Sequence, residues 1–299
     1  MNYDICVIGG CSLDMMFYAN DDGQFSNQPD KIVPGGKAAN QAVAASRAGA
    51  KVTIISRVGK NESGYSIVDN LQYNGVFTNN IEMIEGLEND SANIFIDPIT
   101  RDNEIVRKTG ASDSFTPEMI DRYKDVILNS KIILIQLKIP KDVVTKIINF
   151  CYDNNKTLIL TPCRPAKLCI TDPNNKDLID KVTYITANKK ECIKLFGTSN
   201  IEESISQYPN KLIVTLGDEG VMYHNGKEIV KLSALDIGGI KDTTGAGDTF
   251  NGNFAYGLLC KLPIKENIER AQQAAAMNIQ VETAQTGMPF AQELDNYID

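Results

Sequence analysis

Histidine is almost missing from this chain, which has one, His224, in 299 residues. A Ser-His-Asp or Cys-His mechanism therefore has a single candidate. It lies in the segment YHNGK, whose Asn-Gly pair predicts a hairpin turn. We expect no catalytic role for His224.

Two common nucleotide-binding signatures are also missing. The chain has no G-x-x-x-x-G-K-[ST] loop, and no G-x-G-x-x-G follows its first predicted strand. Both patterns exist because glycine-rich turns bring backbone N–H groups to phosphate. The P-loop and Rossmann interpretations therefore lose their main support.

Paired cysteines are absent as well. The seven cysteines are odd in number and none forms a C-x-x-C pair, which disfavours a zinc site or a redox dithiol. We expect ordinary reduced, buried thiols at Cys6, Cys11, Cys151, Cys163, Cys169, Cys192 and Cys260.

The chain lacks an excess of positive charge and any long apolar run. Its net charge of −8 and pI near 4.9 disfavour nucleic acid as a partner, because such proteins carry a basic patch or stripe. No apolar stretch approaches bilayer length, and MNYDICVIGG predicts a strand rather than a targeting segment. We expect a cytoplasmic protein with no membrane partner.

What is present is a β-α alternation in a chain that is 42% hydrophobic and 23% charged, which suits one large α/β domain. Such repeated units predict a mainly parallel sheet with helices on both faces and a crevice at the carboxyl ends of the strands. The pattern predicts strands at 3–9, 52–58, 132–136, 157–161 and 211–216, a weak strand ending at Ile185, and helices at 62–73, 116–130, 141–154, 249–260, from Lys265 and from Phe290.

The alternation is interrupted in the first third of the chain. Residues 15–34 are irregular and polar, and too long for an ordinary connection. Short strands are predicted at 81–85, 92–97 and 104–108, with a turn at 98–102. We expect residues 15–34 and 92–108 to form a small β lid over the crevice of a single domain, 1–299.

The most informative stretch is DTTGAGDTFNG, residues 242–252. Gly245 and Gly247 flank Ala246 where a polar turn meets a helix, so free N–H groups can point outward together and attract an anion. Asp248 lies in the first helical turn, where a carboxylate can accept a proton from a hydroxyl that attacks phosphorus. The alternative is that these residues only cap a helix.

A second group of polar residues lies near the start of the chain. Asp14 follows the first strand, at the end of the sheet where ligands bind, unless it only caps a turn. In PGGKAANQ the glycine pair permits close backbone approach, and Lys37 and Asn40 would offer donors to a polyhydroxylated ligand. The alternative is an Ala-rich packing helix with a solvated lysine.

With GGKAANQAVAASRAGA followed by DTTGAGDTFNG, the chain resembles the ribokinase (PfkB-type) family of carbohydrate kinases. The intermediate segments GGCSLD, QLKIP, NKKE and TLGDEG extend the resemblance over nearly the whole chain. It implies a three-layer α/β/α fold with a β lid that forms a homodimer interface. It also implies phosphorylation of a sugar's primary hydroxyl by MgATP.

The resemblance implies roles residue by residue. Asp248 matches the catalytic base and Gly245, Ala246 and Gly247 the anion hole. Sugar contacts match Ser12, Asp14, Gly35, Gly36, Lys37, Asn40 and Lys138. Nucleotide contacts match Asn188, Thr215, Gly217, Gly220 and Gln272, and Glu191 matches a residue that arranges Mg²⁺ indirectly. A monovalent-cation site, whose use of K⁺ is left open, matches Asp242, Thr244, Asn278, Val281, Thr283 and Gly287.

Several positions depart from the family pattern. Lys138 stands where a glutamate contacts the sugar, which reverses charge and hydrogen-bond role. The other departures are Ser12 for Asn, Ala38 for Gly, Thr283 for Gly, Gly287 for Ser and a shorter lid. Ribose is the favoured acceptor. The alternatives are another sugar or a nucleoside such as pseudouridine, and a non-catalytic sugar or nucleotide sensor.

Overall fold

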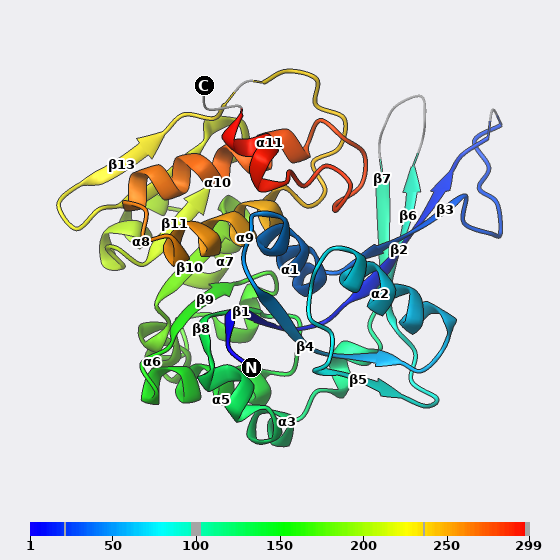
Figure 1. Ribbon diagram of the computed structural model, residues 1–299. Helices are drawn as coiled ribbons and strands as arrows, with labels where there is room; N and C mark the ends of the chain where they lie inside the picture. The colour runs from blue at the N-terminus through cyan, green and yellow to red at the C-terminus, as the bar shows by residue number, and fades with distance from the viewer. Residues whose placement is uncertain (21, 97–102, 236, 297–299) are drawn as a thin grey trace.

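The computed structural model describes residues 1–20, 22–96, 103–235 and 237–296 as two sheets and their helices (Figure 1). The large sheet has the order β13-β12-β11-β10-β9-β8-β1-β4-β5. In chain order its strands are β1 (Tyr3–Ile8), β4 (Val52–Gly59), β5 (Ile81–Ile84), β8 (Ser130–Gln136), β9 (Thr157–Thr161), β10 (Tyr184–Asn188), β11 (Leu212–Thr215), β12 (Val221–His224) and β13 (Ile229–Leu232).

The large sheet is parallel from β5 to β11, and β12 and β13 add an antiparallel edge. Strand β1, which lies between β8 and β4, is buried on both faces, as expected for parallel strands. Cys6 and Ile8 join one hydrophobic cluster, and Ile5 and Val7 join the other. The predicted three-layer α/β/α fold is confirmed.

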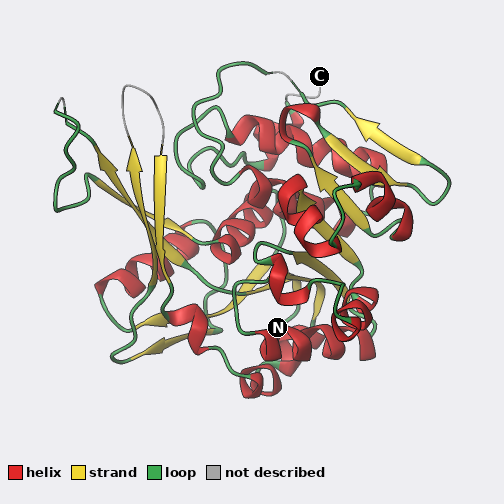
Figure 2. Cartoon of the chain, turned by 180° about the vertical axis from the view of Figure 1, so that it is seen from behind, coloured by secondary structure: helices red, strands yellow, loops and turns green. Residues whose placement is uncertain are grey.

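Helices cover both faces of this sheet (Figures 1 and 2). One face packs against α1 (Lys37–Arg47), α2 (Glu62–Tyr73), α9 (Ala246–Leu259) and α10 (Ile264–Asn278), with α11 (Ala291–Asp295) beyond α10. The other packs against α3 (Pro117–Arg122), α4 (Lys124–Leu128), α5 (Lys141–Asp153), α6 (Pro173–Lys181), α7 (Lys189–Phe196) and α8 (Ile201–Gln207). Within the described residues, no helix is both long enough and apolar enough to cross a bilayer.

The small sheet stands to one side of the large one (Figure 2). Its order is β3 (Lys31–Gly35), β2 (Ser12–Tyr18), β6 (Asp90–Ile96) and β7 (Asn103–Lys108). Residues 15–34 contribute to this sheet as predicted, although their pattern is irregular: residues 15–18 belong to β2, which pairs with β6, and residues 31–34 belong to β3. Asp97 and the turn predicted at 98–102 lie outside the described residues. That this sheet acts as a lid stays a prediction.

Two details of the sequence prediction are wrong. The helix expected at 116–130 is two helices, because the backbone of Tyr123 leaves the helical region (φ −101°, ψ 14°). The Tyr123 hydroxyl also donates to Glu82 Oε1 of β5 at 3.3 Å. Helices α6, α7 and α8 were not predicted, although Asp172, Asn188 and Asn200 cap them through their side chains.

The structure also bears on what the sequence predicted for the cysteines and for the single histidine. All seven cysteines are free, but Cys260 is exposed and Cys163 and Cys169 are half-buried, so the prediction of buried thiols holds for four of them. His224 ends β12, and its Nδ1 accepts the Gly226 N–H at 3.0 Å, which confirms the hairpin turn.

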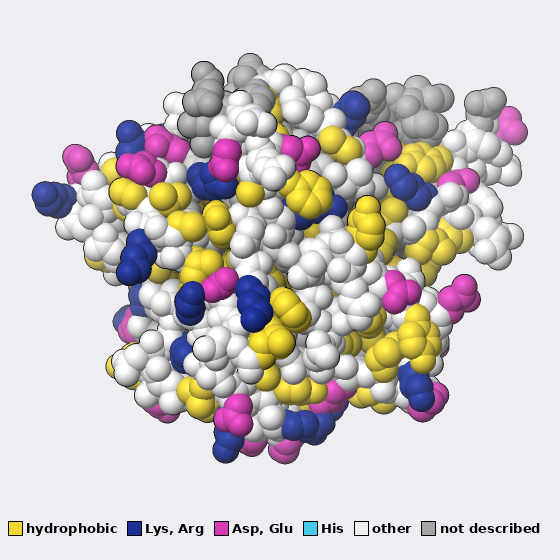
Figure 3. All heavy atoms as spheres, in the orientation of Figure 1, with side chains coloured by type: hydrophobic (Ala, Val, Ile, Leu, Met, Phe, Trp, Pro, Cys, Tyr) yellow, Lys and Arg dark blue, Asp and Glu magenta, His cyan; other side chains and the backbone are white. Residues whose placement is uncertain are grey.

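Charges of both signs are interspersed on the face in Figure 3. The absence of a nucleic-acid partner stays a prediction.

Candidate active site

The turn before α9 needs glycine at one position. Gly245 has φ 85°, and a Cβ there would lie 2.7 Å from the Cα of Ala284. A Cβ at Gly247 would meet nothing within 4 Å, so this side of the turn opens to space. The first N–H groups of a helix have no partner inside it, although that of Ala246 donates to the Thr243 carbonyl at 3.3 Å.

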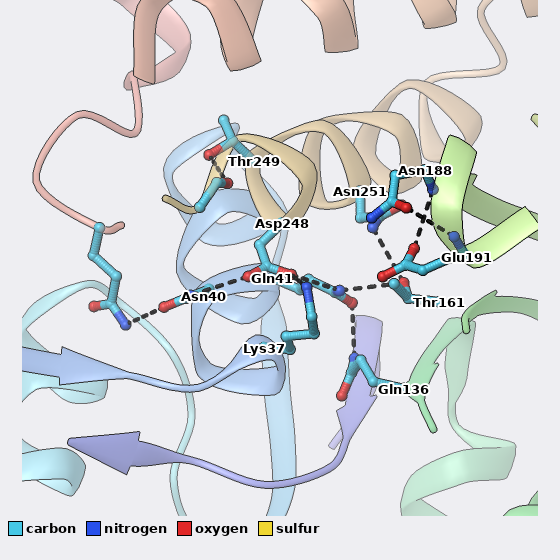
Figure 4. A network of polar contacts seen from close by, with 12 residues as sticks. Lys37, Asn40, Gln41, Gln136, Thr161, Asn188, Glu191, Asp248, Thr249 and Asn251 are labelled. Atoms are coloured by element: carbon cyan, nitrogen blue, oxygen red, sulfur yellow. Dashed lines mark hydrogen bonds and ion pairs between the residues drawn. The ribbon is translucent and has the colours of Figure 1, made fainter. Parts of the chain in front are cut away.

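Asp248 lies in the first turn of α9 and is 4% exposed. Asn40 Nδ2 donates to its Oδ2, and Gln41 Nε2 donates to its Oδ1, each at 3.0 Å (Figure 4). Lys37 Nζ is 3.7 Å from Oδ1. The proximity of Asp248 raises the pKa of Lys37, so this lysine stays charged beside the carboxylate. A buried carboxylate requires such donors and a counter-charge.

Small residues bring α1 close enough to make these contacts. A Cβ at Gly252 of α9 would lie 2.5 Å from the Cβ of Ala44 and 2.6 Å from the Ala45 nitrogen of α1. Gly36, just before α1, has φ 94°, and a Cβ there would lie 2.6 Å from the Ser12 nitrogen. The alanine run therefore serves tight helix packing, and Gly36 serves close approach of the backbone to the start of β2. Close approach of the glycine pair to a ligand stays a prediction.

Asp14 lies within β2 rather than in a loop after β1. Its Oδ1 accepts the Ser12 hydroxyl at 3.4 Å, and a Cβ at Gly35 would lie 2.4 Å from its Oδ2. Burial raises the pKa of Asp14, against the opposing effects of Lys138, the Ser12 hydrogen bond and Arg107. A carboxylate kept partly desolvated in this way is ready to accept hydrogen bonds from a ligand.

One cavity of about 920 Å³ collects most of these side chains. It lies between the small sheet and the carboxyl ends of β8, β9 and β10, which confirms the predicted place of the crevice. The predicted site residues that line it are Ser12, Asp14, Gly36, Lys37, Asn40, Lys138, Glu191, Asp242, Thr244, Gly245 and Asp248. It is also lined by residues that sequence reasoning missed, among them Arg107, Cys163 and Arg164.

The residues predicted to contact nucleotide lie outside the lining of this cavity. Asn188 and Glu191 form a capping box on α7, in which Glu191 Oε2 accepts the Asn188 N–H at 3.0 Å and Asn188 Oδ1 accepts the Glu191 N–H at 2.9 Å (Figure 4). Thr215 ends β11, Gly217 and Gly220 both have positive φ, and Gln272 Nε2 donates to the Ser233 carbonyl at 3.1 Å.

The loop predicted to bind a monovalent cation is tied to the turn before α9. Asp242 accepts the Thr244 N–H at 2.8 Å and the Thr283 N–H at 2.9 Å. Thr283 has φ 73°, a strained value for a residue that replaces a glycine. At Gly287 the family has a serine, but here only glycine has room, because a Cβ at this position would lie 2.3 Å from the Asn278 carbonyl oxygen. Val281 is exposed.

Sequence reasoning missed three glutamines that complete the surroundings of Asp248, namely Gln41, Gln136 and Gln285. Gln41 lies within PGGKAANQ, and its position next to Asn40 at the start of a helix was the available signal. Gln136 begins the segment QLKIP and ends the predicted strand 132–136, so its place at the carboxyl end of a strand was a signal too. Gln285 gave no signal, because its role depends on which elements the fold brings together.

Comparison with known proteins agrees with this geometry. The model of the pfkB family of carbohydrate kinases matches residues 2–291. A ribokinase of Bacillus subtilis is 36% identical over 99% of both chains, and one of Lactococcus lactis is 36% identical over 97% of this chain and 95% of its own.

Among solved structures, an Arabidopsis thaliana ribokinase complexed with ribose and ATP superposes with a TM-score of 0.87 at 21% identity, covering 100% of this chain and 99% of the other. At that identity the likeness concerns the fold. The family match and the two ribokinases together show more: the chain belongs to the PfkB family of carbohydrate kinases and is a sugar kinase of the ribokinase type.

Proposed function

We propose that the protein transfers the γ-phosphoryl group of ATP to the primary hydroxyl of D-ribose, giving ribose 5-phosphate. The observation that carries this proposal is that Asp248 and Asp14 line the same cavity, with the open first turn of α9 beside them. The ribokinase relatives favour ribose as the acceptor and ATP as the donor.

Asp248 is the base in this mechanism. An aspartate is too weak a base to remove a proton from an alcohol in the ground state, so it takes the proton late, as the bond to phosphorus forms and the hydroxyl becomes acidic. Positioning and charge stabilisation carry most of the catalysis. Lys37 and the N–H groups of Gly247 and Asp248 would stabilise the negative charge on the migrating group.

Asp14, Ser12 and Asn40 would hold the sugar. Burial favours the protonated form of Asp14, so hydroxyl donors from a sugar would stabilise its ionised form on binding. Asn40 faces Asp248 through its Nδ2, which places a sugar contact next to the base.

The residues present also fit the implied metal ions. Glu191 lines the cavity and commits one oxygen to its capping box, so the other is available near the phosphates for Mg²⁺ or its water shell. When bound, Mg²⁺ neutralises charge on the phosphates. Near Asp242, the buried Oδ1 of Asn278 has no hydrogen-bond partner in the described parts of the chain, which suits a cation in that loop. K⁺ is our proposal for it.

A second acceptor class is favoured by Lys138. This side chain lines the cavity, forms no ion pair with any described residue, and stands where a sugar-binding glutamate is expected. An ammonium group binds a carbonyl or an acid group as well as a hydroxyl. A nucleoside such as pseudouridine, or a sugar acid, is therefore the second candidate.

The small sheet supports two further proposals. Its strands β2, β6 and β7 line the cavity, so it is placed to act as a lid. The exposed apolar side chains of Ile32 and Val106, on the face of the sheet opposite to the cavity-lining Ile94 and Ile105, suit a homodimer formed through this lid. We also propose that the enzyme works in the cytoplasm.

The direct test is an acceptor panel with MgATP containing ribose, deoxyribose, fructose, a keto-deoxy sugar acid, uridine and pseudouridine. We expect ADP release with ribose, and phosphorus NMR should show a phosphate ester on C5. Ribose is excluded if it is phosphorylated no faster than the background without acceptor. Absence of turnover with every acceptor would favour the sensor alternative.

A further inference from the structure

Both oxygens of the Asp248 carboxylate are occupied by side-chain amides from consecutive residues of α1. Asn40 donates to Oδ2 and Gln41 to Oδ1, both at 3.0 Å, and Gln41 Nε2 also lies 3.2 Å from the Thr161 hydroxyl (Figure 4). Gln41 is fully buried and Asn40 is 5% exposed. The direction of these bonds matters, because a carboxylate only accepts and an amide offers both a donor end and an acceptor end.

Each of these two amides is oriented by a further amide. Gln136, at the end of β8, donates from Nε2 to Gln41 Oε1 at 2.7 Å. Gln285, in the loop after α10, donates from Nε2 to Asn40 Oδ1 at 2.9 Å. We call Gln136, Gln41, Asn40 and Gln285 the amide clamp. All four members are buried.

The outer two amides are themselves fixed. Gln285 Oε1 accepts from Asn70 Nδ2 at 2.8 Å, and its backbone carbonyl accepts from Arg47 at 2.7 Å. Gln136 is accommodated by Gly9, where a Cβ would lie 2.3 Å from Gln136 Oε1. The two donors that face Asn40 and Gln41 therefore come from two separate parts of the fold, the loop after α10 and the end of β8, and neither outer amide is hydrogen-bonded to Asp248.

An amide that turns by 180° exchanges its donor and acceptor ends. If Asn40 turned, its oxygen would face the Asp248 carboxylate and its nitrogen would face the Nε2 donor of Gln285. Both contacts would then be repulsive. The same holds for Gln41 between Gln136 and Asp248. In a buried site such mismatches are costly, and a chain of amides strengthens each bond in it.

We propose that Gln136 and Gln285 are positioning residues of the phosphoryl transfer, which act through Gln41 and Asn40 to hold the Asp248 carboxylate in one orientation. This inference rests on the proposed role of Asp248. Asp248 lines the cavity, so a carboxylate held in one orientation would meet the acceptor hydroxyl from one direction.

The test replaces each outer glutamine by methionine, which has a similar length and volume but no donor. For Gln136→Met and Gln285→Met we expect kcat to fall roughly 10- to 100-fold, the cost of a misplaced reacting group, with the KM for ATP unchanged within about twofold. The matched control is Gln273→Met. Gln273 is also a buried glutamine, and it donates to the Leu294 carbonyl away from the cavity. It should keep the wild-type kcat.

A double variant separates positioning from general damage. If Gln285 acts through Asn40, then Asn40→Ala with Gln285→Met should have the kcat of Asn40→Ala alone. Multiplicative losses would overturn the proposal, as would a kcat within about twofold of wild type in both methionine variants. If Gln285→Met fails to fold, as judged by thermal melting, Gln136→Met with Gln41→Ala tests the same clamp from the other side.

A readout without turnover keeps this test separate from that of the kinase activity. In proton–nitrogen spectra, the side-chain NH₂ signal of Asn40 should move in Gln285→Met and that of Gln41 in Gln136→Met, as each loses its polarising donor. Unmoved signals overturn the clamp even in an active enzyme. If the signals move in a protein that phosphorylates no acceptor, the proposed function is overturned, and the amide clamp only orients Asp248 within a binding site.

Discussion

Asn40 and Asp248 are 208 residues apart in sequence, and they are joined by a 3.0 Å hydrogen bond. Asn40, which is expected to contact the sugar, therefore touches Asp248, which is expected to remove the proton from the sugar hydroxyl. The two sequence motifs are one structural unit, because neither side chain reaches its position without the other's helix. Substitutions on either side should consequently affect the same kinetic step.

Asp248→Asn tests the base. The variant keeps the shape of the side chain, but its NH₂ group would face a donor from Asn40 or Gln41. We expect kcat to fall by roughly 1000-fold or more. ATP affinity, measured by calorimetry, should stay within about threefold. A kcat above about a tenth of wild type would contradict the assignment.

Asp14→Asn tests the cost of a buried carboxylate. Burial raises the pKa of Asp14 above its ordinary 3.8, so the folded state holds more protons than the unfolded state between the two pKa values. Stability therefore falls as pH rises through this window, and the full cost is present above the folded pKa. At pH 7 the variant should have a higher Tm than wild type, and this difference in Tm should become smaller as the pH is lowered. The variant should also bind the acceptor much more weakly. A lower Tm at pH 7 would refute this account.

Lys138→Glu tests acceptor choice. The substitution restores the residue type expected at a sugar contact, so kcat/KM for ribose should rise relative to that for pseudouridine or a sugar acid. The same acceptor panel measures both ratios. Lys141→Glu is the control, because Lys141 is an exposed lysine of α5 outside the cavity lining. An unchanged profile would mean that Lys138 does not contact the acceptor.

Two neighbouring glycines form a matched pair. Gly245→Ala should lose about 1 to 3 kcal/mol from its positive φ alone, and more from contact with Ala284. Gly247→Ala should not lose stability, because its methyl group meets nothing within 4 Å and alanine favours the helix. It should still lower kcat, since the methyl group stands beside the proposed phosphoryl position. Denaturant unfolding and steady-state kinetics distinguish the two effects.

Val106→Lys tests the proposed dimer. Val106 is 50% exposed on β7, so a charge there should not disturb the monomer. We expect light scattering to show a dimer for wild type and a monomer for the variant. Tyr73→Lys, an exposed aromatic position at the end of α2, should leave the assembly unchanged. Identical masses for wild type and Val106→Lys would exclude this interface.

Much of the fold could be predicted because its signals are local. Continuous apolar strands such as 132–136 and the Pro117 helix start depend on nearby residues alone. The break at Tyr123 could not be predicted, because no proline or glycine marks it between 118 and 130. The segment NKKE, residues 188–191, allows two interpretations, because the same spacing that suits a phosphate site also makes the capping box of Asn188 and Glu191.

The candidate site was predicted in a similarly uneven way. Asp14, Lys37, Lys138 and Asp248 were found because motifs place functional side chains at the ends of elements, and all four line the cavity. Gln136 ends a predicted strand but was not singled out, because a glutamine there is as common in packing as in a site, and Gln285 could not be found, because a glutamine in a loop has no distinctive pattern. Their meaning arises only from the amides that they meet.

The contact of α1 with α9 has a consequence for synthesis. A nascent chain that has emerged as far as residue 240 contains all nine strands of the large sheet, but it lacks α9, against which Ala44 and Ala45 of α1 pack. Until α9 has left the ribosome, the amides of Asn40 and Gln41 have no carboxylate to bind. We therefore expect the site to form only late in translation, and products truncated before α9 to be inactive.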